Sequence, residues 1–315
     1  MNKDFISVIS PVYGDKRNVK LLYDALTSVL NKMDVDYEII LVNDGCPYGS
    51  GEEIEKLALD DTHVKFIDLS RNFGQHYAIK AGIDYAKGDY AVVMDCDLQD
   101  NPEDIPRFYA KIKEGHDIVF GERVKRCDSL FKKFLSESYG FVQKHMTDFY
   151  PTRNHGNFSI ISKKVLNEFK KINNYNFNYG TMIYFIGFHI EYIPIEKEER
   201  LEGKSGYNII KGIKLALKSI ISNSSKPLTF AAYCSLGMFI ISICFILKLL
   251  FDYFVFHNKL LGWTSIMASI FLISGLLFVY LSLLGLYIAG IFREVKNRPL
   301  YIVRKTINVE RNYNE

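Results

Sequence analysis

The sequence predicts an α/β fold in which a mostly parallel sheet is followed by a membrane-associated C-terminal region. Short apolar segments rich in β-branched residues alternate with amphipathic helical segments up to about residue 120. Long stretches without any charged residue begin near residue 228. Strands that alternate with helices are typical of a doubly wound parallel sheet, and 315 residues suffice for one large domain plus a membrane segment.

The elements of the first 120 residues follow from hydrophobic periodicity. Apolar residues at helical spacing predict amphipathic helices, and runs of β-branched residues predict buried strands. The expected strands cover 5–13, 37–42, 64–69, 90–94 and 117–120, and the expected helices begin at Gly14 and cover 74–87 and 102–114.

The fourth expected strand ends in a cluster of acidic residues, Asp95, Asp97 and Asp100. In open α/β sheets, ligands bind beyond the carboxyl ends of the strands. Asp95 and Asp97 are two positions apart, so an extended chain points both the same way, where they can share one Mg²⁺ or Mn²⁺ with substrate phosphates. The alternative is a solvated acidic turn that caps the helix beginning at Pro102. The short Asp-x-Asp pattern leaves both interpretations open.

Several function classes are disfavoured. No G-x-G-x-x-G follows the first strand and no Walker sequence occurs, which argues against a dinucleotide oxidoreductase and a P-loop NTPase. Gln99 stands where a phosphotransferase of the haloacid dehalogenase type has Thr or Val. The net charge of +3 predicts no nucleic-acid partner. The five cysteines lack zinc-binding spacing and are expected to be reduced thiols.

Two transmembrane helices, at 229–251 and 266–292, are predicted from the charge-free stretches, because about 20 apolar residues span a bilayer. The alternative is a pair of buried core helices. Lys and Arg residues flank both ends of this region, so the positive-inside rule predicts cytoplasmic termini and a cytoplasmic first domain. The N-terminus leads directly into a strand, so we expect no signal peptide. The predicted location is the cytoplasmic membrane, with a multi-pass topology.

The segment before the first span is expected to lie along the membrane surface. Its Ile and Leu residues fall mainly on one helical face, and Lys211, Lys214 and Lys218 fall on another. Such a helix can lie in the headgroup region. A packed amphipathic helix of the preceding domain is the alternative.

Four short motifs occur in order: Ser10–Tyr13, Val42–Gly45, Ser70–Gly74 and Met94–Asp100. With the membrane spans, they resemble the family-2 glycosyltransferases of the GT-A fold over nearly the whole chain. The nearest subgroup is the polyprenyl-phosphate glycosyltransferases, which include dolichol-phosphate mannose synthases and bacterial GtrB-type proteins. The resemblance implies a GT-A glycosyltransferase domain at 1–205, a juxtamembrane amphipathic helix at 206–227, a two-helix transmembrane hairpin at 228–292 and a cytoplasmic tail at 293–315.

The same resemblance implies roles for individual residues. Without it, Asp44 is better explained as an ordinary turn residue, and Arg123, Lys132 and Arg200 are better explained as solvated surface charges. The implied nucleotide contacts are Pro11, Tyr13 and Asp44, and the implied metal ligands are Asp95 and Asp97 with Gln99. Arg123 is an implied phosphate contact. The implied contacts of the mobile loop with the donor diphosphate are Arg200, Lys204 and Ser205. The implied contacts with the lipid phosphate are Lys132, Lys133 and Ser136.

The chain departs from the family pattern at two motifs. Asn43-Asp44-Gly45-Cys46 stands where much of the family has Asp-Asp-Gly-Ser, which removes one charge. Gly156-Asn157-Phe158-Ser159 stands where the family often has Gly-Asp-Phe-Arg. The second departure affects the presumed acceptor side, where His155 and Asn157 are candidate contacts. A buried, hydrogen-bonded structural role is the alternative for each.

The implied activity is the inverting, metal-dependent transfer of a sugar from a nucleotide-diphosphate sugar to a polyprenyl phosphate, such as undecaprenyl phosphate, for cell-surface glycans. A lipid phosphate is ionised at neutral pH, so it needs positive charge rather than a strong base. A hydroxyl acceptor would require an acidic base such as Asp97 or Asp100. The alternatives are extension of a lipid-linked oligosaccharide or surface polysaccharide, and a non-catalytic membrane scaffold. GtrB-type relatives also suggest a homotetramer.

Overall fold

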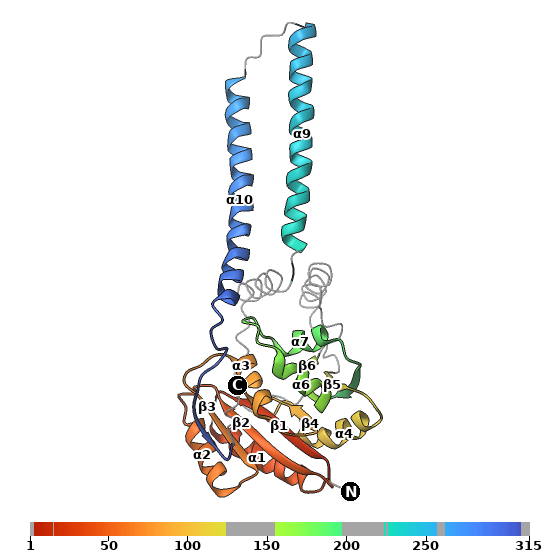
Figure 1. The fold of residues 1–315 in the computed structure, drawn as a ribbon, viewed down its shortest axis with the longest axis vertical. Coiled ribbons are helices and arrows are strands. Elements are labelled where there is room, and N and C mark those ends of the chain that lie inside the picture. Colours follow the sequence, from red (N-terminus) through yellow and green to blue (C-terminus); the bar gives the residue numbers. More distant parts are fainter. Residues whose placement is uncertain are drawn as a thin grey trace. The chain divides into compact units, whose positions relative to one another are not determined.

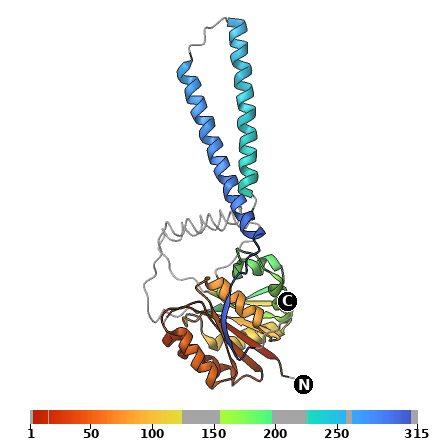
Figure 2. The same cartoon turned by 60° about the vertical axis from the view of Figure 1, so that its left-hand side comes forward.

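The computed structural model describes residues 3–14, 16–123, 155–196, 224, 226–256 and 262–309. The chain divides into two compact units. One contains a sheet with its covering helices, and the other contains two long helices (Figures 1 and 2). The first unit comprises Met1–Leu130, Phe149–Gly206 and Arg298–Glu315, and the second comprises Phe131–Asp148 and Tyr207–Asn297.

The first unit is built on an eight-stranded, mostly parallel sheet in the order β7-β5-β6-β4-β1-β2-β3-β8. Strands β3, β2, β1 and β4 are mutually parallel, as are β5 and β7, whereas β6 and β8 run antiparallel to their neighbours. This arrangement confirms the predicted α/β class. The strands are β1 Phe5–Val12, β2 Asp36–Asn43, β3 Val64–Leu69, β4 Tyr90–Val93, β5 Ile118–Arg123, β6 His155–Ser162, β7 Ile190–Ile195 and β8 Val303–Ile307.

Helices cover both faces of this sheet. Helices α1, α2 and α4 share one apolar core, and α3, α6 and α7 share the other. Successive strand residues point to opposite faces: Ile39 packs in the first core and Ile40 in the second. The helices are α1 Lys16–Leu30, α2 Ser50–Asp60, α3 Gln75–Tyr85, α4 Ile105–Lys113, α6 Lys163–Lys171 and α7 Tyr179–Ile186, with a short 3₁₀ helix, η1, at Pro102–Asp104.

Helix α3 lies unusually close to the central strand. A Cβ atom added to Gly82 would lie 2.3 Å from Cγ2 of Ile9 in β1. Only a residue without a side chain therefore fits at this contact. This contact holds the C-terminal half of α3 against β1.

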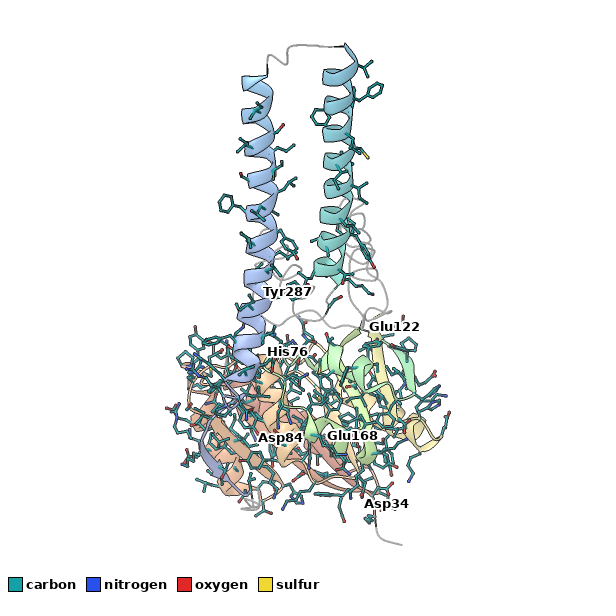
Figure 3. The ribbon with its side chains drawn as sticks, turned by 45° about the horizontal axis from the view of Figure 1, so that its top comes forward. Asp34, His76, Asp84, Glu122, Glu168 and Tyr287 are labelled. Atoms are coloured by element: carbon teal, nitrogen blue, oxygen red, sulfur yellow. The ribbon has the colours of Figure 1, made fainter. Side chains whose placement is uncertain are left out.

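A buried ion pair joins α3 to two other segments. Lys80, fully buried, lies 2.5 Å from Asp84 and donates to the carbonyls of Phe169 and Lys170 at the end of α6. The Tyr301 hydroxyl donates to the other Asp84 oxygen at 2.8 Å. Asp84 lies near the C-terminal end of α3, and His76 lies at its N-terminal end (Figure 3). The network thus fixes α3 against α6 and the C-terminal segment.

The expected cytoplasmic tail at 293–315 contains a strand that sequence analysis did not predict. Strand β8 pairs antiparallel with β3 and completes one edge of the sheet. Its five residues, Val-Arg-Lys-Thr-Ile, follow a helix that ends at Val295 and are too few for a clear periodic pattern. Part of the expected tail is therefore an integral strand of the first unit.

The second unit contains helices α9, Lys226–Phe256, and α10, Trp263–Val295, which are both longer than the expected spans. The Tyr287 hydroxyl of α10 donates to the Ser224 carbonyl just before α9. Among the described residues, one helical segment, Leu272–Val295, is long and apolar enough to cross a membrane, with a mean hydropathy of 2.2 and none of it buried.

Candidate functional site

A pocket of about 320 Å³ lies at the carboxyl ends of β1, β2 and β4. Ligands bind in this position in open α/β sheets. The lining combines backbone, aromatic and acidic groups from loops far apart in the chain. The lining residues are Pro11, Val12, Tyr13, Gly14, Asn18, Asp44, Asn72, Gly74, Gln75, Asp95, Cys96 and Asp97.

Asp95 and Asp97 both line the pocket, but they lie on a turn rather than an extended strand. Strand β4 ends at Val93. Leu98 adopts a left-handed conformation with φ of 53°, and the Gln99 backbone N–H donates to Oδ1 of Asp97 at 3.3 Å. The expectation of an extended pair was therefore wrong, because the local turn redirects the chain. The two carboxylates nevertheless share one pocket.

Two amide groups orient the Asp95 carboxylate. Its Oδ1 accepts hydrogen bonds from Nε2 of Gln75 at 2.7 Å and from Nδ2 of Asn157 at 3.1 Å. Gln75 is the first residue of α3. Asn157 belongs to β6, which runs antiparallel to β4 and pairs Ser159 with Val93. Continuing this register by two residues places Asn157 opposite Asp95. Gln75 was not predicted from the sequence, and Asn157 was left open between an acceptor-side contact and a hydrogen-bonded structural role, since neither the β4–β6 pairing nor this contact was expected.

Asp44 holds a loop at the pocket edge. The backbone N–H groups of Phe73 and Gly74 donate to its two oxygens at 2.7 and 2.9 Å. Burial raises the pKa of Asp44, and these two hydrogen bonds oppose that rise. Asp44 therefore shapes the loop that carries Asn72 and Gly74 into the pocket lining.

The turn of Gly45 fits tightly against the same loop. Its φ is +61°, and a Cβ atom there would lie 2.4 Å from the Arg71 carbonyl carbon. Both the conformation and the space therefore require glycine.

Asn43 explains one departure from the family pattern. Its Nδ2 donates to Oδ1 of the buried Asp68 at 2.8 Å, and its Oδ1 accepts from the Cys46 N–H at 3.2 Å. A carboxylate at position 43 would face Asp68 with like charge and no donor. The Sγ atom of Cys46 lies 3.3 Å from both Gly14 N and Gly14 O, which ties the next motif residue to the loop after β1.

Tyr13 and Pro11 provide the apolar part of the pocket. The Tyr13 side chain is 54% exposed and meets the Tyr48 ring edge to face, with ring centroids 6.3 Å apart. An exposed ring beside a pocket offers a flat surface for a planar ligand group. Cys96 adds no nucleophile, because burial and the neighbouring carboxylates raise its thiol pKa to about 12.

The acidic residues suit a hard divalent cation. Mg²⁺ and Mn²⁺ prefer oxygen ligands, and Mg²⁺ is commonly held by one or two carboxylates together with substrate phosphates. Asp95 and Asp97 meet this requirement by their chemistry. Within the described residues no group of three or more His, Cys, Asp or Glu side chains is placed to hold a metal ion. Gln99 is 6% exposed and is not part of the pocket lining.

The other expected phosphate contacts lie outside the described side chains. Arg123 ends β5 and His155 begins β6, and the description of both stops at the backbone. The helix expected at 206–227 is described only at residues 224, 226 and 227. The expected contacts that fall outside the described residues altogether are Lys132, Lys133, Ser136, Arg200, Lys204 and Ser205.

Comparisons with known proteins support both the fold and the motifs. The family model for glycosyl transferase family 2 matches residues 7–170. The chain is 35% identical over 310 residues to the uncharacterized glycosyltransferase YkcC of Bacillus subtilis (strain 168), covering 96% of this chain and 94% of the relative. It is 31% identical over 304 residues to the SfII prophage-derived bactoprenol glucosyl transferase of Shigella flexneri, covering 96% and 98%.

A solved structure shares the fold. The crystal structure of mannosyl-3-phosphoglycerate synthase from Rubrobacter xylanophilus superposes with a TM-score of 0.52 at 11% identity. The match covers 70% of this chain and 73% of that one. At this identity the likeness bears on the arrangement of strands and helices alone.

Proposed function

Because the chain belongs to glycosyl transferase family 2, we propose that it moves a sugar from a nucleotide-diphosphate sugar to a polyprenyl phosphate at a membrane surface. The observation that carries the proposal is the pocket at the carboxyl ends of β1, β2 and β4, which joins an aromatic wall to two carboxylates. Full-length similarity to a bactoprenol glucosyl transferase supports the lipid acceptor.

The donor would lie across this pocket. Pro11 and Tyr13 flank the nucleobase, and the loop held by Asp44 closes the edge beside it. Asp95 and Asp97 would hold Mg²⁺ or Mn²⁺, which would supply positive charge to offset the charge that develops on the leaving diphosphate. Gln75 and Asn157 keep the Asp95 carboxylate directed towards the ligand.

The acceptor phosphate attacks the anomeric carbon from the side opposite the leaving group and inverts its configuration. It needs positive charge to position it rather than a base. We assign this charge to Arg123, Lys132 and Lys133, with Ser136 as a hydrogen-bond donor. Arg200, Lys204 and Ser205 would close over the diphosphate.

The membrane location is part of the same proposal. Helices α9 and α10 have the length of two membrane spans, at about 1.5 Å of rise per residue. With Lys and Arg flanking the pair, both termini and the catalytic domain face the cytoplasm, and 206–227 lies along the cytoplasmic leaflet.

The test uses the full-length protein in detergent with undecaprenyl phosphate, Mn²⁺ or Mg²⁺ and a panel of nucleotide sugars. We expect a monoglycosyl phospholipid by mass spectrometry, lost with a chelator and reduced more than about 100-fold by Asp97→Asn. Asp24→Asn, a half-exposed carboxylate on α1, is the matched control and should leave turnover unchanged.

Other outcomes would redirect or refute the proposal. Metal-dependent hydrolysis of the donor without a lipid product would indicate a different acceptor, such as a growing oligosaccharide. The absence of turnover and metal dependence with every donor would refute the catalytic function.

A further inference from the structure

Strand β8 carries an irregularity beside the pocket loops. In its pairing with β3, Lys305 lies opposite Asp68 and Val303 lies opposite Leu69, so Arg304 is an extra residue in the ladder. Such a bulge redirects a side chain and is often found next to active sites. Here the redirected side chain is an arginine.

The Arg304 guanidinium binds the end of β3 at three points. Its Nη2 donates to the carbonyls of Leu69 and Ser70 at 3.2 and 3.0 Å. Its Nε lies 3.4 Å from Oδ2 of Asp68. Arginine is suited to this task, because its planar fork of donors can serve a carboxylate and carbonyl groups together.

These contacts connect Arg304 to both loops that shape the pocket edge. Asp68, only 8% exposed, also accepts the hydrogen bond from Asn43, the residue before Asp44. Ser70 leads into the loop whose N–H groups bind Asp44, and its own N–H donates to the Ile302 carbonyl at 2.8 Å. Arg304, whose own side chain is 59% exposed, therefore pairs with the buried carboxylate that holds one loop and binds the start of the other.

We propose that Arg304 is a positioning residue for the nucleotide side of the pocket, so that a strand following α10 helps to set donor affinity. This inference rests on the proposed function. Arg304 acts through Asp68 and the 70–74 loop and does not itself line the pocket. Replacement of Arg304 is therefore expected to weaken binding of the donor more than binding of the lipid acceptor.

Lys305 provides a matched control on the same strand. It forms an exposed ion pair with Glu55 at 2.5 Å, in which the side chains are 48% and 38% exposed. Exposed pairs of this kind contribute little to stability. Lys305→Gln removes one positive charge, as Arg304→Gln does. Lys305 lies opposite Asp68 in the ladder, but its ammonium pairs with Glu55 and not with the Asp68 carboxylate.

The experiment compares the wild type, Arg304→Gln, Arg304→Lys and Lys305→Gln as full-length protein in detergent. We would measure binding of uridine and guanosine diphosphates with Mn²⁺ by calorimetry, the KM for donor and for undecaprenyl phosphate, and Tm. Arg304→Gln should weaken nucleotide binding and raise the donor KM roughly tenfold, with the acceptor KM unchanged, because the loops that contact the nucleotide shift. Arg304→Lys should recover part of the loss, and Lys305→Gln should match the wild type.

A purely structural role predicts a different pattern, in which Tm and the amount of active protein fall while the donor KM of the folded fraction stays the same. That pattern would overturn the inference. If Arg304→Gln does not fold, the Asp68→Asn variant is used instead. This variant keeps an oxygen that accepts from Asn43 and removes the charge that Arg304 binds. An unchanged donor KM in Asp68→Asn would again overturn the inference. A wild type that turns over no donor of the nucleotide-sugar panel would refute the proposed function as well, whereas equal nucleotide binding by the wild type and Arg304→Gln refutes the positioning role alone.

Discussion

The two faces of the sheet are held by different kinds of contact. Under α1, α2 and α4 the packing is by aliphatic and aromatic groups such as Phe108 and Phe158, whose ring centroids are 4.6 Å apart. Under α3 and α6 the buried Lys80 pairs with the partly buried Asp84 among the apolar side chains. Apolar contacts are not directional, whereas hydrogen-bonded charges require one geometry. The difference suggests that the polar face fixes the orientation of α3, the helix that supplies Gln75 to the pocket.

The largest effect is expected from breaking the ion pair. Lys80→Ala leaves the partly buried Asp84 carboxylate without its charged partner and removes the donor to two α6 carbonyls, which should lower the free energy of unfolding by about 3–5 kcal/mol. Thermal unfolding in detergent measures this loss.

Replacing both members of the ion pair tests whether the pair orients α3 independently of its contribution to the stability of the fold. Lys80→Met with Asp84→Leu should recover most of the lost stability, because replacing a whole buried pair by apolar groups is often neutral. If α3 is oriented by the pair, the double variant should still show a raised donor KM. Phe108→Ala, on the other face, should cost a similar amount of stability and leave the donor KM unchanged. Equal donor KM values in all of these variants would contradict the comparison.

A smaller loss of stability is expected from Tyr301→Phe. It removes the hydroxyl that donates to Asp84 and leaves the ring in place. A hydrogen bond to a charged group contributes about 1.5–3 kcal/mol, so Tm should fall by several degrees in the same detergent assay. A Tm equal to that of the wild type would indicate that the C-terminal segment is not held through Asp84.

Asn157→Ala tests the orientation of Asp95 from the opposite side. Asp95 keeps the hydrogen bond from Gln75 but loses the one from β6. We expect kcat/KM to fall roughly tenfold, because groups that orient a metal-binding carboxylate typically have effects of this size. Asn157→Asp should be worse than Asn157→Ala, since it places a second negative charge beside Asp95; the reverse order would exclude an orienting role for the amide.

The smallest effect is expected from pH. Burial lowers the pKa of His76, at the N-terminal end of α3, below its ordinary value of about 6.5. The unfolded chain therefore binds more protons below pH 6.5, so stability should fall as the pH decreases through that value and the folded-state pKa. Tm measured between pH 5 and 8 should show this decline, and His76→Gln should reduce it. An unchanged slope in the variant would assign the decline to other groups.

The sequence predicted the parallel half of the sheet because each of its strands is a buried run of apolar residues. Strands β6, β7 and β8 were not expected. β7 has mostly half-buried residues, and β8 is recognisable only once β3 offers it an edge. Periodicity reports burial within a segment, and it carries no information on which distant segment pairs with it.

The sequence also predicted part of the candidate site. Pro11, Tyr13, Asp44, Asp95 and Asp97 were expected at the ends of strands and do line one pocket. The contacts around them were not predictable, because Gln75 and Asn157 reach Asp95, and Arg304 reaches Asp68, only through tertiary pairing. Asn43 is instructive: the missing charge in its motif is matched by an aspartate 25 positions later, which no local pattern could indicate.

The position of β8 also has a consequence for how the molecule is made. The strand is synthesised after both long helices, so the ribosome must complete α10 before the edge of the sheet at β3 can be covered. A nascent chain, or a soluble fragment cut before residue 228, presents that edge with open backbone donors and acceptors, a known template for aggregation. Folding of the first unit therefore depends on synthesis of the two helices that separate its segments. A truncated version of this unit should include residues 298–309, so that β8 can cover the edge of the sheet.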